Sequence, residues 1–198
     1  MRLFVAVKIP EGIAASIEPL RARLAETKAD VRWVDAAIYH VTVKFLGEVE
    51  EPVAQALGER LKKAAAEVGA FWADVEGVGP LPERGPARVV VADVREDPRW
   101  EKLHRVVDSA VGGMGLPMDT RVLVPHVTLG RVRTNHGMNR LLRLMEKHVA
   151  DYFGRFLVER VVLMKSELGG AQVGRGGGPR YSEVSAAELK VAEGARFG

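Results

Sequence analysis

Short apolar runs and longer amphipathic segments alternate along the 198 residues of the chain. Runs rich in Val, Ile, Leu and Phe predict strands, because β-branched and aromatic side chains pack well on a pleated sheet. Segments with apolar residues three and four positions apart predict helices with one apolar face. The predicted strands cover residues 2–9, 31–34, 40–46, 71–78, 88–94, 126–132, 155–165 and 180–189. The predicted helices cover about 10–24, 52–68, 97–112 and 137–149.

Proline and glycine divide this pattern. Pro19 lies inside the first predicted helix and should kink or split it, because proline removes a backbone hydrogen bond. Residues 77–86 are rich in both residue types and mark a loop, after which the order of strands and helices repeats. Each half reads approximately strand–helix–strand–strand–helix–strand. The sequence therefore predicts an α+β protein with two pseudo-symmetric βαββαβ-like halves.

The clearest repeat is His-Val-Thr followed by an apolar residue, which begins at His40 and again 86 residues later at His126. Side chains alternate across a strand, so His40 and Thr42 share one face of the first strand. His126 and Thr128 likewise share one face of the second, and the valines between them would face a core. If the two strands face each other, two imidazoles and two hydroxyls line one pocket.

A structural role is the usual interpretation of a single histidine, and we interpret His104, His136 and His148 in that way. The paired motif favours a functional role instead. Two buried polar groups on the same strand face cost stability unless they are satisfied, and here the arrangement occurs twice.

Two imidazoles suit acid–base catalysis, because histidine titrates near neutral pH and one ring can accept a proton while the other donates one. In-line displacement at a phosphodiester needs both steps, and the hydroxyls of Thr42 and Thr128 can donate hydrogen bonds to the non-bridging oxygens. Either histidine can be the acid. Two histidines without a matching carboxylate or cysteine make a poor zinc site, and no Gly-x-Ser-x-Gly segment supports a serine hydrolase. We expect neither a metal nor a cofactor.

Composition narrows the alternatives. The chain is 47% hydrophobic and 28% charged, as in ordinary globular proteins, and its net charge of +3 is compatible with a polyanionic ligand without establishing one. The absence of cysteine excludes disulfides, thiolate nucleophiles and cysteine-ligated metals. Residues 1–9 reach Pro10 before a long apolar segment develops, and no apolar stretch is long enough to span a bilayer. The expected location is the cytoplasm.

These motifs resemble the 2H phosphoesterases, in particular the RNA 2′,3′-cyclic phosphodiesterase branch, also called 2′-5′ RNA ligase. The segments that carry the resemblance are residues 1–7, 40–49 and 125–131. The resemblance implies one bilobal α+β domain, with antiparallel sheets facing a central cleft. In this chain the lobes would be about 1–80 and 87–198, and strands can be exchanged between them.

The resemblance also implies metal-independent hydrolysis of RNA 2′,3′-cyclic phosphate ends to a 2′-phosphate. It casts His40 as the proton donor and His126 as the proton acceptor. The expected partner is an RNA or oligonucleotide end, with no membrane, and the expected assembly is a monomer. Two alternatives stay open: 2′-5′ RNA ligation in the same site, and an RNA-end-binding module without turnover.

Five further residues are weaker candidates. Lys44 shares strand parity with His40 and Thr42 and could contact phosphate, although a solvated lysine is an equal alternative. Arg131 has the opposite parity from His126 and reaches the phosphate only if Gly130 permits a bulge. Phe45, Trp33 and Tyr181 are aromatic, and for each we favour core packing over stacking on a base.

The glycine-rich segment 169–180 allows two interpretations. Its backbone and two arginines suit a phosphate cradle, but the composition favours a flexible hairpin loop.

Overall fold

The computed structural model describes residues 1–167 and 180–191. The four α-helices of this part are α1 (Glu11–Ala25), α2 (Glu51–Ala65), α3 (Pro98–Gly112) and α4 (Met138–Met145), and the two 3-10 helices are η1 (Ala36–Ile38) and η2 (Glu146–His148). The strands are β1 (Arg2–Lys8), β2 (Val31–Trp33), β3 (His40–Glu48), β4 (Phe71–Leu81), β5 (Val89–Val94), β6 (His126–Val132), β7 (Tyr152–Val158), β8 (Arg160–Glu167) and β9 (Arg180–Glu188). The predicted α+β class is confirmed, while the glycine-rich segment lies almost entirely outside the described residues.

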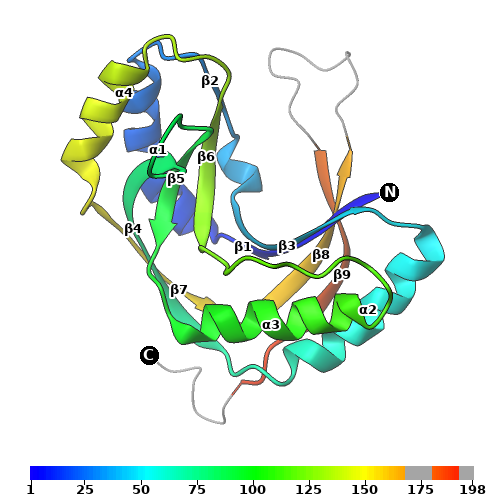
Figure 1. Cartoon of the computed structure of the whole chain (residues 1–198). Helices are drawn as coiled ribbons and strands as arrows, with labels where there is room; N and C mark the ends of the chain where they lie inside the picture. Colours follow the sequence, from blue (N-terminus) through cyan, green and yellow to red (C-terminus); the bar gives the residue numbers. More distant parts are fainter. Residues whose placement is uncertain (168–179, 192–198) are drawn as a thin grey trace.

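The strands form a single strongly curved antiparallel sheet (Figure 1). Its order is β7-β4-β5-β6-β3-β1-β8-β9, and the short β2 also pairs with β6. Two separate facing sheets were expected, and this expectation is wrong. The strands β3 and β6 that carry the histidines pair with each other at Val41 and Val127, and this pair joins the two halves of the sheet.

Each half of the sheet contains strands from both halves of the chain. The early strand β4 pairs with β5 and β7, whereas the late strands β8 and β9 extend the half that contains β1 and β3. This exchange also explains why the predicted strand 155–165 is two strands. Strand β7 pairs with β4, and strand β8 pairs with β1. The chain therefore crosses from one half of the sheet to the other at Glu159, between β7 and β8.

The four helices pack on one face of the sheet, outside its curve (Figure 1). Helix α1 remains one helix through Pro19, with buried Ile17 and Leu24 at the core. On the strands, Leu3, Val5 and Val7 face the same core. Burial of side chains of this size stabilises the fold by about 1.5–3 kcal/mol each, so the core fixes the helix-covered face. None of the described helices is long and apolar enough to cross a membrane.

Candidate active site

The two histidine motifs lie side by side at the centre of the sheet. Val41 pairs with Val127, and both are fully buried in the core beneath the helices. Continuing this antiparallel register by one residue in each direction places His40 opposite Thr128 and Thr42 opposite His126. Because side chains alternate, these four residues lie on the other face of the sheet, away from the helices. The register therefore brings together the four residues that the sequence singled out.

Each imidazole is held by the same backbone contact. The Nδ1 atom of His40 lies 2.8 Å from the carbonyl oxygen of Ile38, and Nδ1 of His126 lies 2.8 Å from the carbonyl oxygen of Val124. A carbonyl oxygen only accepts, so Nδ1 carries a proton in both rings and donates it. The Nε2 atom of each ring is then left to accept a proton when the ring is neutral, or to donate one when it is charged.

A β-bulge follows the threonine in both motifs. On β3, Thr42 pairs with Ala6 and Lys44 with Val5, so Val43 is the extra residue. A bulge interrupts the alternation of side chains. Lys44 is therefore placed on the helix-covered face, and Phe45 returns to the face that carries His40.

The second bulge repeats this geometry on β6. Thr128 pairs with Val91 of β5 and Gly130 with Val90, so Leu129 is the extra residue. Gly130 consequently takes the position equivalent to Lys44, and Arg131 takes the position equivalent to Phe45. The condition that the sequence set for Arg131, a bulge at this point, is met.

The prediction that Lys44 shares the face of His40 and Thr42 is wrong. Its side chain is only 1% exposed, and its Nζ lies 2.6 Å from Oδ1 of Asp108 and 3.2 Å from Oδ1 of Asp119. The nearer contact is one of charge, because Nζ makes no well-aligned hydrogen bond to a described residue. Burial alone would raise the pKa of Asp108, but Lys44 and the Asp119 backbone N–H outweigh it and lower that pKa. Lys44 thus anchors β3 to α3 and does not lie on the face that carries the histidines.

His104 and His148, which were predicted to be structural, each contact a carboxylate. His104 Nε2 lies 3.0 Å from Asp119 Oδ2, and His104, Asp108 and Asp119 converge as a metal site would. The buried Lys44 ammonium already supplies the cation that these carboxylates need. His148 pairs with Asp151 at 2.7 Å, at the end of η2.

Gly130 is required by packing on the helix-covered face. A Cβ atom there would lie 2.5 Å from Val31 Cγ1 and 3.0 Å from Trp33 Cε3. Trp33 pairs with Gly130 across β2 and β6 and packs against the core, so its predicted core role is confirmed.

Aromatic side chains surround His40. The ring centroids of Phe4 and His40 are 5.0 Å apart, those of Phe4 and Tyr181 5.0 Å, and those of His40 and Tyr181 5.4 Å. Phe45 adds a fourth ring, 6.3 Å from Phe4, and is 65% exposed. The core role predicted for Phe45 is wrong because the bulge turns this ring to the open face, and Tyr181 packs beside His40 on that same face.

The two histidines have different neighbours on their outer sides. Lys8 of β1 pairs with His40, and its Nζ lies 2.8 Å from Oε2 of Glu183. Asp93 of β5 pairs with His126. Neither Lys8 nor Asp93 is predicted from the sequence, because nothing local to either residue indicates that its strand pairs with a histidine motif.

Charge and burial make the surroundings of His40 and His126 unequal. Burial lowers the pKa of His40, with further lowering by Arg131 and His126, while the hydrogen bond to Ile38 acts in the opposite direction. Loss of surrounding water raises the pKa of the Asp93 carboxyl, His126 opposes this shift, and Glu83 adds to it.

Comparisons with known proteins identify the family. Residues 9–170 match the 2′-5′ RNA ligase superfamily. The chain is 28% identical to an RNA 2′,3′-cyclic phosphodiesterase of Methanothermobacter thermautotrophicus, over 96% of this chain and 99% of the relative. It is 30% identical to one of Archaeoglobus fulgidus, over 85% and 92%.

Solved structures share the fold. A protein of Thermus thermophilus aligns with a TM-score of 0.75 and 25% identity over 96% of this chain and 99% of its own. E. coli LigT complexed with 3′-AMP aligns with a TM-score of 0.72 and 24% identity, over 95% and 97%. Together with the paired histidine motifs, the match over most of the chain shows that this protein belongs to the 2′-5′ RNA ligase superfamily of 2H phosphoesterases.

Proposed function

We propose that the chain hydrolyses 2′,3′-cyclic phosphate ends of RNA to 2′-phosphomonoesters, by two-histidine acid–base catalysis that requires no metal ion. One observation carries the proposal: two imidazoles share a sheet face, each with Nδ1 bound to a backbone carbonyl and Nε2 available. The relatives named RNA 2′,3′-cyclic phosphodiesterase support the choice of substrate.

In the proposed reaction, water attacks the phosphorus atom and the bond between phosphorus and the ribose 3′ oxygen breaks. Nε2 of His126 accepts the proton of the attacking water, and Nε2 of His40 donates a proton to the departing 3′ oxygen. Thr42 and Thr128 donate hydrogen bonds to the non-bridging oxygens, where negative charge increases in the transition state. Arg131 adds positive charge to the same region.

The order of the two histidines depends on bound substrate. In the free protein, burial and Arg131 lower the pKa of His40 and favour its neutral form. An anionic phosphate between the rings offsets Arg131 and favours the imidazolium, so His40 becomes a donor in the complex. The reverse order remains chemically complete, with His40 as base and His126, beside Asp93, as acid.

The aromatic side chains around His40 suit the terminal base. Phe45 exposes most of its ring on the face that holds the histidines, and Tyr181 and Phe4 lie behind it. Stacking on an aromatic ring tolerates every base, because each base has a π face. We assign this cluster to the nucleobase at the RNA end.

Ligation is the second candidate, favoured by the match to the 2′-5′ RNA ligase superfamily. A 5′-hydroxyl in place of the attacking water would leave a 2′-5′ linkage through the same proton transfers. RNA halves that bear a cyclic phosphate and a 5′-hydroxyl distinguish the two reactions by their products.

The direct test is turnover of a nucleoside and an oligonucleotide 2′,3′-cyclic phosphate in excess EDTA, with the position of the product phosphate determined by NMR. We expect a 2′-phosphate, and turnover at least about 10²-fold slower in a variant that combines His40→Ala and His126→Ala. Turnover near the wild-type rate in that variant contradicts the catalytic assignment. Binding of these compounds without any product would identify a binding module, and a 3′-phosphate product would contradict the proposed scissile bond.

A further inference from the structure

Two arginines stand directly opposite each other next to the histidines. Beyond Thr128, strand β6 pairs with β2, and Arg131 is the partner of Arg32. Directly paired side chains point to the same face of a sheet, and neighbouring strands lie about 4.8 Å apart. Since Trp33 and Gly130 face the core, the two arginines lie on the face that carries the histidines, and both are exposed.

This pairing is unfavourable by itself, because like charges directly opposite on neighbouring strands destabilise a sheet. Within residues 1–167 and 180–191, neither guanidinium forms an ion pair or a side-chain hydrogen bond with a carboxylate. The acidic residues that flank β2 have other partners. Asp30 Oδ2 accepts a hydrogen bond from Thr134 at 2.9 Å, and Asp35 Oδ1 accepts one from the Ala37 N–H at 2.9 Å.

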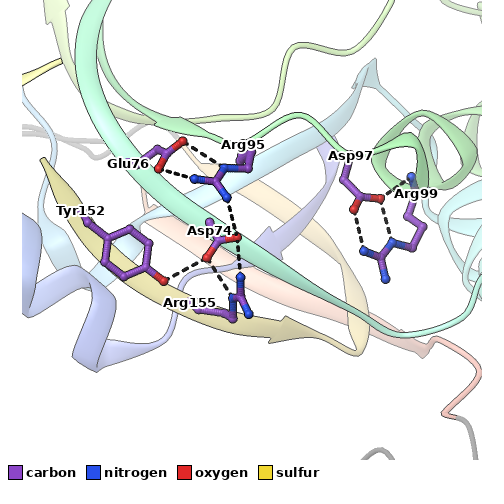
Figure 2. A network of polar contacts seen from close by, with 7 residues as sticks. All are labelled: Asp74, Glu76, Arg95, Asp97, Arg99, Tyr152 and Arg155. Carbon is purple, nitrogen blue, oxygen red and sulfur yellow. Dashed lines mark hydrogen bonds and ion pairs between the residues drawn. The ribbon is translucent and has the colours of Figure 1, made fainter. Parts of the chain in front are cut away.

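Arginines elsewhere in the sheet show the contrast. Figure 2 shows that Arg155 and Arg95 lie against Asp74 and Glu76, where each guanidinium has a carboxylate partner. Arg155 reaches both oxygens of Asp74, at 2.9 and 3.0 Å. Arg95 and Arg155 thus have carboxylate partners within the protein. The pair beside the active site has none among the described residues and is distinguished from other unpaired arginines by the direct pairing of two like charges, which an anion from outside can neutralise.

We propose that Arg32 and Arg131 bind the phosphodiester that precedes the terminal nucleotide, so that the preferred substrate is an oligonucleotide rather than a mononucleotide. The inference rests on the proposed function for the identity of the adjacent site. Arg131 lies three residues beyond Thr128, at most about 10 Å along the strand, which is the scale of one nucleotide. Guanidinium groups bind phosphate oxygens in a bidentate manner, and two of them suit one phosphodiester.

The arrangement also gives the RNA a direction. Phe45 and Arg131 occupy equivalent positions after the two bulges, and they extend from opposite ends of the group of histidines and threonines. In the proposed complex the terminal base stacks on Phe45, and the chain continues from its 5′ side toward Arg131 and Arg32.

The test uses two pairs of ligands. Turnover is compared for a nucleoside 2′,3′-cyclic phosphate and for a dinucleotide with the same end, and calorimetry compares the corresponding 2′-phosphate products. For Arg32→Gln we expect the ratio of kcat/KM, dinucleotide over mononucleotide, to fall about tenfold, as for a lost charge-assisted contact. The matched control Arg105→Gln removes the same charge from the exposed surface of α3 and should keep the wild-type ratio.

A neutral linkage sharpens the result. A dinucleotide with a methylphosphonate linkage should lose its advantage in the wild type, and Arg32→Gln should then change little for this substrate. Without any ligand, Arg32→Gln should unfold at an equal or slightly higher temperature, because it relieves repulsion from Arg131; a purely structural Arg32 would give a lower one.

Each outcome decides a separate point. Equal losses for the mononucleotide and the dinucleotide, or an unchanged ratio, would overturn the second phosphate site while the hydrolysis stands. If no substrate is turned over, the proposed function fails, and the calorimetric comparison still decides the site. Arg32→Gln must then weaken the dinucleotide more than the mononucleotide, and equal weakening would contradict the inference.

Discussion

On β3 the histidine has Lys8 as its outer neighbour, whereas on β6 the equivalent neighbour is Asp93. The two strands otherwise share their plan: a histidine held through Nδ1, a threonine two residues later, and a bulge. After the bulge they differ again, with Phe45 on one strand and Arg131 on the other. In the proposed mechanism the shared features serve the reaction at phosphorus, and the differences assign one side to a base and the other to phosphate.

The positions that the bulges turn toward the helices also differ. Lys44 fills a buried site with charge, while Gly130 leaves room for Val31 and Trp33. One strand is thus fixed by an ion pair to α3, and the other by close packing of β2. The same kind of bulge therefore accommodates a buried ion pair on one strand and close apolar packing on the other. The two strands resemble each other only on the face that carries the histidines.

The largest effect is expected from the feature that both strands share. His40→Ala and His126→Ala should each lower kcat by about 10²–10⁴-fold, the range of acid–base contributions. The double variant should lose little more than either single variant, because the two groups act in one step. Steady-state kinetics measure this, and His136→Ala, in an exposed loop, is the control that should retain activity.

A second prediction compares Lys44 and Gly130, the residues that the bulges place on the helix-covered face. Lys44→Met should lower the free energy of unfolding by about 3–5 kcal/mol, because it leaves Asp108 buried without its partner charge. Gly130→Ala should cost about 1–3 kcal/mol through overpacking against Val31 and Trp33. Urea denaturation measures both, and Lys102→Met on the exposed surface of α3 should change stability by less than about 0.5 kcal/mol. A loss no greater than this control for Lys44→Met would show that the ion pair does not anchor β3.

The threonines test how far the symmetry extends. Thr42→Val and Thr128→Val keep the shape of the side chain and remove the hydroxyl. Each should lower kcat by about 10²-fold, as for the loss of one donor to a charged transition state. The two losses should be similar, and a large difference would show that one non-bridging oxygen is bound by other groups.

Asp93 gives the smallest effect and the most specific one. Asp93 pairs with His126 and its carboxylate favours positive charge beside it, so Asp93→Asn should move the limb of the pH profile that depends on His126. If His126 is the base, the rising limb of kcat/KM against pH moves to lower pH, and the falling limb stays in place. Movement of the falling limb instead would assign the acid role to His126. Glu96→Gln, an exposed substitution of the same charge, should move neither limb.

The sequence predicted the elements and the four central residues because both depend on local patterns. Alternation along a strand was enough to pair His40 with Thr42. It failed after Thr42 and Thr128, because each bulge depends on the partner strand, β1 or β5, and leaves no signal in the motif. For this reason the prediction placed Lys44 on the histidine face and Phe45 in the core, and the structure shows the reverse. The glycine at 130 did indicate the bulge that brings Arg131 to the active face. Asp93 and Lys8 were missed because their role follows from long-range pairing.

The most direct test of the division of labour uses a leaving group that needs no acid. A 3′-deoxynucleoside 2′-(p-nitrophenyl phosphate) has no 3′-hydroxyl to attack phosphorus and places nitrophenolate where the 3′ oxygen departs, and protonation of this group contributes little to the rate. With His40 as donor and His126 as acceptor, the loss of activity in His40→Ala should largely disappear on this substrate. The loss in His126→Ala should persist. Rescue of His126→Ala with a persistent loss in His40→Ala would contradict the assignment and reverse the order of the two histidines.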